Sequence, residues 1–183
     1  LAFLAIRTND KVGAILFSSQ VEKYIPPKKG ASHVWRLIKE IFTYEPDDLN
    51  TNLNAVLTTL NRVAKRHCIA FLISDCMDSG FETSLKLAAR KHDLTVIRIS
   101  NPAEGELPRI GLISLVDPET GETALMNARN KGLRETWRAH RQSHRDYLTD
   151  LFNKAGADHV HLSTDGKVVE PLIRLFEKRM RRL

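Results

Sequence analysis

The stretch Ile69-Ala70-Phe71-Leu72-Ile73-Ser74-Asp75 decides the fold class of this 183-residue chain. Its unbroken apolar run predicts a strand that is buried on both faces, as the strands of a parallel sheet are. In open α/β sheets, ligands bind outside the carboxyl ends of such strands. Asp75 follows one of these ends, and it is therefore the first candidate for a functional side chain.

Helical and extended patterns alternate on both sides of this strand. The predicted strands cover residues 12–17, 21–25, 69–74, 94–99, 111–116, 123–126 and 158–162, and the predicted helices cover 32–42, 53–64, 80–92, 133–155 and a last segment beginning near Pro171. The first two strands form a predicted hairpin that ends at Pro26-Pro27, and the fifth and sixth form another. The alternation elsewhere predicts an α/β fold with a doubly wound, mostly parallel sheet and helices on both faces.

Length and composition predict one domain over residues 1–183. The net charge of +6 permits acidic partners, but Lys and Arg are spread along the chain, and only residues 178–182 form a dense basic cluster. At a chain end such a cluster is usually a solvated helix tail, so we expect no nucleic-acid partner. Cys68 and Cys76 flank one predicted strand, too far apart for a disulfide, which favours a reducing, cytoplasmic location.

The first residues indicate that this chain comes from a longer protein. Residues 1–6 are apolar, they do not begin with methionine, and they lack the charged front and cleavage site of a signal peptide. We expect them to be the end of a helix. No stretch is apolar and long enough to predict a membrane span, although the parent protein could be tethered to a membrane.

Two carboxylates follow the central predicted strand in Ser74-Asp75-Cys76-Met77-Asp78. With the Ser74 hydroxyl they offer the oxygen ligands that suit a hard cation such as Mg²⁺. Alternatively, Asp75 orders the loop by accepting hydrogen bonds from backbone amides. The pattern leaves both interpretations open.

Thr51 and Asn52 precede the helical pattern that begins at Leu53. A Thr or Asn in this place is a standard helix N-cap. The functional interpretation is that the Thr51 hydroxyl and the Asp75 carboxylate converge at the carboxyl edge of one sheet as metal ligands, with Ser74, Asp78 and Asn52 supporting them.

The sequence contains no GxSxG elbow, Walker loop or GxGxxG, which argues against a nucleophilic hydrolase, an ATPase or a dinucleotide enzyme. We therefore expect a non-enzymatic protein. The alternative is a metal-dependent phosphoester hydrolase that uses Asp75 and Asp78 as cation ligands.

Several segments together resemble a bacterial family, the von Willebrand factor A-like domains called domain of unknown function 58. The matching segments are Asp10-Lys11-Val12-Gly13, Leu16-Phe17-Ser18, Pro26-Pro27-Lys28-Lys29-Gly30, Thr51-Asn52-Leu53, Leu72-Ile73-Ser74-Asp75, Ala89-Arg90-Lys91-His92-Asp93, Glu106-Leu107-Pro108 and residues 117–122. The resemblance covers nearly the whole chain.

The resemblance implies a metal-ion-dependent adhesion site, in which an Asp-x-Ser-x-Ser loop, a distant Thr and a distant Asp hold Mg²⁺. Thr51 matches the distant Thr and Asp75 the distant Asp, whereas the Asp-x-Ser-x-Ser loop and the first central strand have no counterpart here. We therefore expect Mg²⁺ binding to be weak or absent. We also expect the strands that end at Phe17 and Asp75 either to pair with each other or to recruit another chain, so that the sheet is rearranged or the chain self-associates.

The same resemblance implies a function. It suggests a protein-protein interaction module that accompanies a MoxR-type AAA+ ATPase in a chaperone or assembly role. This expectation rests on the family and not on the fold alone.

Overall fold

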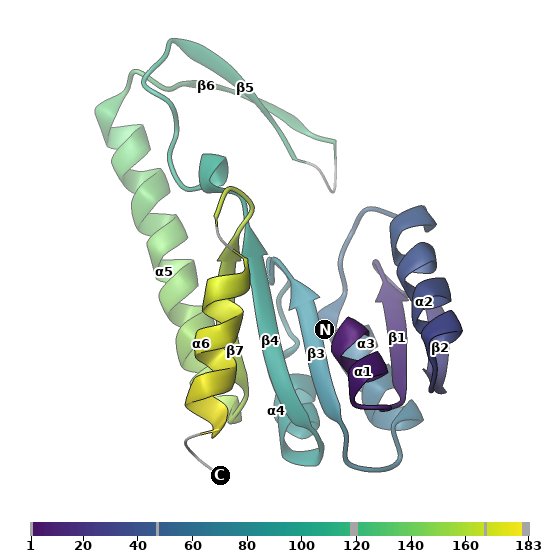
Figure 1. Cartoon of the computed structure of the whole chain (residues 1–183). Helices are drawn as coiled ribbons and strands as arrows, with labels where there is room; N and C mark the ends of the chain where they lie inside the picture. The colour runs from purple at the N-terminus through teal and green to yellow at the C-terminus, as the bar shows by residue number, and fades with distance from the viewer. Residues whose placement is uncertain (1, 47, 118–120, 167, 181–183) are drawn as a thin grey trace.

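A computed structural model describes residues 2–46, 48–117, 121–166 and 168–180 (Figure 1). Its helices are α1 (Ala2–Arg7), α2 (Ala31–Thr43), α3 (Leu53–Val63), α4 (Glu82–Lys91), the short 3-10 helix η1 (Pro102–Glu104), α5 (Lys131–Ala155) and α6 (Val169–Met180). Its strands are β1 (Val12–Phe17), β2 (Val21–Lys28), β3 (Ile69–Ser74), β4 (Asp93–Ser100), β5 (Leu112–Val116), β6 (Thr123–Asn127) and β7 (Asp158–Ser163).

The central sheet has the order β3-β4-β7, and both strand pairs are parallel. Helices connect these strands, as parallel pairing requires, and the predicted α/β architecture is confirmed. The middle strand β4 is the most deeply buried, because the sheet is covered on both faces. Leu94 and Val96 are buried on one face of the sheet, and Thr95 and Ile97 are buried on the other.

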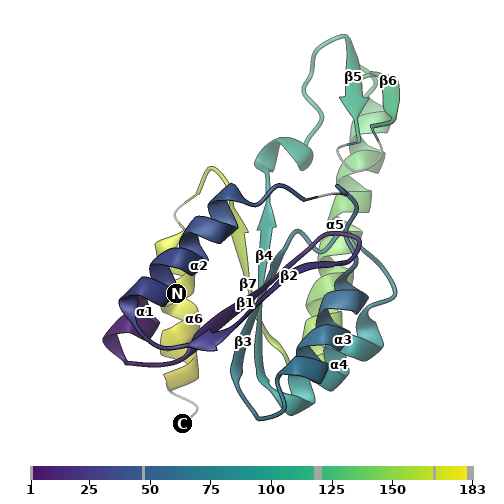
Figure 2. The same cartoon turned by 90° about the vertical axis from the view of Figure 1, so that its right-hand side faces the viewer.

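Helices α3, α4 and α5 pack on one face of this sheet, and α1, α2 and α6 lie on the other side of the molecule (Figure 2). The first face holds the main core, in which Leu72 and Val96 pack with Leu57 of α3, Leu85 of α4 and Phe152 of α5. On the second face the Phe176 ring of α6 meets Phe71 edge-on, and the Arg179 guanidinium donates to the Thr95 hydroxyl at 2.8 Å.

The predicted hairpin forms as β1 and β2, but β2 continues through Pro26 and Pro27 to Lys28. The prediction that the two prolines end the strand was wrong, because this edge strand tolerates residues without an N–H. Gly13 permits the close approach of the two strands. A Cβ at Gly13 would lie 2.6 Å from the carbonyl oxygen of Ile25.

The β1-β2 hairpin and the β3-β4-β7 sheet are separate sheets, so the predicted single, mostly parallel sheet is not formed within the described residues. Figure 1 shows β1 beyond β3, on the side opposite β4. The edges of β1 and β3 do not pair with each other, and the side chains of Ile69 and Ile73 on β3 are 65% and 49% exposed. An apolar strand with an open edge is the element that pairs with another chain, so self-association stays a prediction.

The strands β5 and β6 form an antiparallel pair that projects beyond the carboxyl ends of the central strands, next to the start of α5 (Figure 2). The turn predicted between them falls partly on residues 118–120, which lie outside the described residues. None of the described helices has the length and apolar character needed to cross a membrane.

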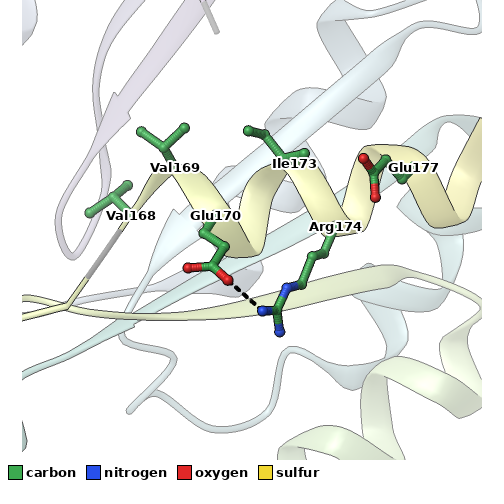
Figure 3. Close-up of a pocket in the computed structure, with 6 residues that line it drawn as sticks. All are labelled: Val168, Val169, Glu170, Ile173, Arg174 and Glu177. Atoms are coloured by element: carbon green, nitrogen blue, oxygen red, sulfur yellow. Dashed lines mark hydrogen bonds and ion pairs between the residues drawn. The ribbon is translucent and has the colours of Figure 1, made fainter.

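The outer side of α6 carries an open depression (Figure 3). It is lined by Val168, Val169, Glu170, Ile173, Arg174 and Glu177. Glu170 and Arg174 form an ion pair one turn apart, while Val169 and Ile173 are 67% and 51% exposed.

Candidate functional site

Three chain segments meet at the carboxyl end of the central sheet. The backbone N–H of Asn52, just before α3, donates to the carbonyl of Ser18, just after β1, at 2.9 Å. The next amide, that of Leu53, donates to Oδ2 of Asp78 in the loop after β3, at 2.7 Å. The loop that carries Thr51 is therefore held directly against the loop that carries Asp75.

Asp78 provides this link between the two loops. Its Oδ2 accepts from the Leu53 amide, and its Oδ1 accepts from the Ser79 amide at 2.6 Å. The N-terminus of α3 stabilises the carboxylate, because unpaired amides and the helix dipole both favour a negative charge there. Because each oxygen accepts a backbone hydrogen bond, Asp78 is a structural link between the two loops.

Asn52, and not Thr51, caps α3. The Asn52 side-chain oxygen accepts from the Ala55 amide at 2.9 Å, and its backbone is extended, as an N-cap requires. The capping interpretation of Thr51 was therefore wrong by one residue. Thr51 lies half-buried immediately before the cap.

Asp75 is exposed, and its Oδ1 accepts from the Met77 amide and from the Ser74 hydroxyl, both at 3.3 Å. Ser74 Oγ in turn accepts from the Cys76 amide at 3.1 Å. These contacts hold Cys76 in a left-handed conformation with φ 58°, which is uncommon for a residue other than glycine. Asp75 thus orders its loop through one oxygen, as the second interpretation of the sequence proposed.

The thiol of Cys76 is fully inaccessible at the same turn. Burial, and then the negative charge of Asp75, raises the pKa of Cys76 to about 12. The thiol is therefore protonated at neutral pH and is a poor nucleophile or metal ligand.

The Thr51 hydroxyl and the Asp75 carboxylate are hard oxygen donors of the kind that Mg²⁺ takes. Two protein donors, however, leave most of an octahedral coordination sphere to water. Among the residues that the structure describes, no group of three or more His, Cys, Asp or Glu side chains is arranged to hold a metal ion. We therefore expect any magnesium ion at Thr51 and Asp75 to need further ligands.

Arg98, a basic residue at the same end of the sheet, was not among the site residues predicted from the sequence. Arg98 lies near the carboxyl end of β4, and its register partners are Ser74 on β3 and His161 on β7. Arg98 is half-buried in a strand whose other residues are mostly apolar. A charged side chain inside the apolar run 94–99 was the signal that could have found it.

The sequence of residues 1–147 matches the family described as "Protein of unknown function DUF58". The chain belongs to this family. The DUF58 chain is 23% identical over 184 aligned residues to an uncharacterized protein of Mycobacterium tuberculosis strain H37Rv, which covers 99% of the chain but 58% of that protein. It is 26% identical over 160 residues to an uncharacterized protein of Mycobacterium avium, covering 86% of the chain and 94% of that protein. The chain thus spans little more than half of the first relative.

Two crystal structures share the fold of the DUF58 chain. One is the conserved hypothetical protein BatB from Bacteroides thetaiotaomicron, with a TM-score of 0.54 and 18% identity over 100% of this chain and 87% of that one. The other is an aerotolerance-related membrane protein from Bacteroides fragilis that carries multiple mutations to serine. Its TM-score is 0.54 and its sequence identity is 13%, and the match covers 96% of this chain and 81% of that one. At such identities the similarity shows the fold and not the activity.

Proposed function

We propose that this DUF58 chain is a non-enzymatic protein-protein interaction module of the von Willebrand factor A-like type, and that its partner binds at the carboxyl end of the β3-β4-β7 sheet. The observation that carries this proposal is the contact between the Leu53 amide and the Asp78 carboxylate, which holds the Thr51 and Asp75 loops together. Ligand sites in open α/β sheets lie at this end.

Asp75 is the side chain that we assign to the partner. It is exposed, and no hydrogen bond to its Oδ2 is formed within the described ranges of the chain. A cation at this place needs further oxygen donors from outside this chain, with Thr51 and Asp75 supplying two of them.

Exposed apolar side chains support an interaction role over a catalytic one. On α2, Trp35, Ile41 and Phe42 are 58%, 47% and 84% exposed. Apolar side chains that gather on one helix at this exposure are typical of protein contact surfaces. By family resemblance, the partner we propose is a MoxR-type AAA+ ATPase, in a chaperone or assembly role. We place this interaction in the cytoplasm, with the parent protein tethered to a membrane.

The test is a binding measurement between the full-length protein and a purified MoxR-type AAA+ ATPase from the same organism. Asp75→Ala should weaken binding about tenfold, because hydrogen bonds to a charged group contribute enough for a factor of this size. Asp150→Ala is the matched control, since Asp150 is an exposed acid on α5. Equal affinities of the two variants would overturn the proposal, and phosphoester hydrolysis that Asp75→Ala abolishes would favour the hydrolase instead.

A further inference from the structure

A cluster of basic side chains lies on the α5 face of the sheet, beside its carboxyl end. Arg98 is on this face because Leu94 and Val96, four and two residues earlier, pack in the core with α5. His161 is on the same face, because the ring of His159, two residues earlier, contacts Phe152 of α5 at 5.4 Å between centroids. Arg98 and His161 are register partners on adjacent parallel strands.

The α5 helix brings further positive charge to these strand ends. Its buried residues Leu148 and Phe152 hold it on the sheet, and one turn earlier His144 Nε2 lies 3.2 Å from the Cys76 carbonyl oxygen. Arg145 follows His144 on the same helix. Arg141, one turn before Arg145, forms an ion pair with Glu104 at 2.7 Å.

Arg98, Arg145 and His161, which we call the Arg98 cluster, are close enough to influence each other. Burial first, and then the charges of Arg145 and Arg141, lower the pKa of Arg98. Partial desolvation of the ring, and then the charges of Arg98 and Arg145, lower the pKa of His161. Arg98 and Arg145 therefore share one positive region, and the lowered pKa of His161 favours the neutral ring beside it.

Within the described residues, Arg98 and Arg145 have no carboxylate counter-ion. Glu104 neutralises Arg141, but neither Arg98 nor Arg145 forms an ion pair with a carboxylate in the part of the chain that the structure describes. A half-buried guanidinium without an ion-pair partner is unfavourable, because it has lost part of its hydration and no carboxylate compensates for that loss. A bound anion would remove this cost.

We propose that the Arg98 cluster binds the phosphate group of a small molecule. The planar donor fork of arginine matches phosphate oxygens in a bidentate geometry, and two arginines supply two such forks. The Ser100 hydroxyl, 2.6 Å from His161 Nε2, adds a further polar group to the edge of the cluster. Because Arg98 is half-buried while Arg145 and His161 are exposed, a compact tetrahedral anion suits the cluster. This site uses neither Thr51 nor Asp75, so it can be tested separately from the proposed partner contact.

The experiment is a titration of the protein with inorganic phosphate, followed by calorimetry and by amide chemical shifts in a phosphate-free buffer of low ionic strength. We expect saturable binding, with the largest shifts at residues 98–100, 145 and 161. Arg145→Ala should weaken this binding about tenfold, since a hydrogen bond to a charged group contributes enough for a factor of this size. Arg145 is exposed, so this variant should fold.

Arg90→Ala is the matched control. It removes the same charge from an exposed position at the end of α4, next to the amino end of β4. Arg98→Lys keeps the charge but removes the fork, and it should also weaken binding while the far-UV spectrum stays unchanged. In parallel titrations, glycerol 3-phosphate that binds at least as tightly as inorganic phosphate indicates a phosphate ester as the ligand, and inorganic phosphate that binds alone indicates the free ion.

Two results would overturn the proposal. One is a linear, unsaturated response to both phosphates, which indicates only screening by salt. The other is equal weakening in Arg145→Ala and Arg90→Ala, which indicates an effect of net charge and not of this site.

Discussion

Replacing Asp78 by alanine tests whether this carboxylate, and not a metal, joins the two loops of the site. The substitution removes the acceptor of the Leu53 amide, which belongs to a fully buried residue at the start of α3. It also removes the acceptor of the Ser79 amide, but Ser79 is exposed and water can replace that contact. The loss of stability should therefore come almost entirely from the Leu53 contact.

The magnitude follows from two contributions. A hydrogen bond to a charged group contributes about 1.5–3 kcal/mol, and much of this is lost when a buried amide has no acceptor. A negative charge at a helix N-terminus contributes roughly 0.3–1 kcal/mol more. Asp78→Ala should therefore lower the free energy of unfolding by about 2–4 kcal/mol.

Urea denaturation followed by circular dichroism measures this loss of stability. Two further variants show which part of it comes from the hydrogen bond and which from the charge. Asp78→Asn keeps one acceptor but not the charge, so its loss should fall between those of the wild type and Asp78→Ala. Asp75→Ala should cost no more than about 0.5 kcal/mol, because Asp75 is exposed and its contacts at 3.3 Å are long. If Asp78→Ala is no more destabilising than Asp75→Ala, the Asp78 carboxylate does not hold the loops together, and the geometric basis of the site is lost.

Three further predictions concern the metal, the open edge and the histidines. Titration of Mg²⁺ by calorimetry should show weak binding, since Thr51 and Asp75 supply two donors, and tight stoichiometric binding would contradict this. The protein should self-associate as its concentration rises, and Ile73→Lys, which places a charge on the open edge of β3, should reduce this in sedimentation velocity, whereas a monomer at every concentration would contradict it. The free energy of unfolding should fall as the pH decreases below about 6.5: burial lowers the pKa of His92 and of His144, so the unfolded chain takes up protons that the folded chain does not. Urea titrations at several pH values check this, and a flat profile between neutral and mildly acidic pH would contradict it.

The parts of the fold that the sequence predicts are those encoded by short segments. The apolar run ending at Ser74 forms the expected parallel strand, but the expected burial on both faces was wrong, because only Leu72 of this strand is buried. The hairpin turns at residues 18–20, and α5 ends before Gly156, whose φ of 75° is the left-handed conformation typical of a helix end. Each of these features depends on the local pattern of apolar residues or on the backbone preference of a single residue.

The separation of β1-β2 from β3-β4-β7, and the side chains that it leaves exposed, could not be predicted from such segments. The spacing in α2 predicts one apolar stripe made of Val34, Trp35, Ile38, Ile41 and Phe42. Val34 is buried as the pattern predicts, but Trp35, Ile41 and Phe42 are exposed, and His33 and Leu37 are buried instead. Periodicity tells which residues are apolar, but the tertiary partner decides which of them are covered. For the same reason, the exposed Ile69 and Ile73 of β3 could be assigned to an open edge only from the family resemblance, and not from their own pattern.

The site shows the same limit at the level of single atoms. The sequence places a carboxylate after β3 and polar residues before α3, but Thr51 and Asn52 both suit an N-cap, and only the backbone geometry gives that role to Asn52. From the sequence alone, Asp75 and Asp78 are equally plausible cation ligands. In the structure Asp78 accepts from the Leu53 amide of α3 and from the Ser79 amide, whereas Asp75 is exposed, so one acid links the loops and the other is accessible to a partner. The Arg98 cluster lies beyond β4 on the α5 face, and the carboxyl end of one sheet therefore offers an acidic contact on the β3 side and a basic one on the β7 side. Because an Asp75 variant tests the first and an Arg145 variant the second, the two assignments can fail independently.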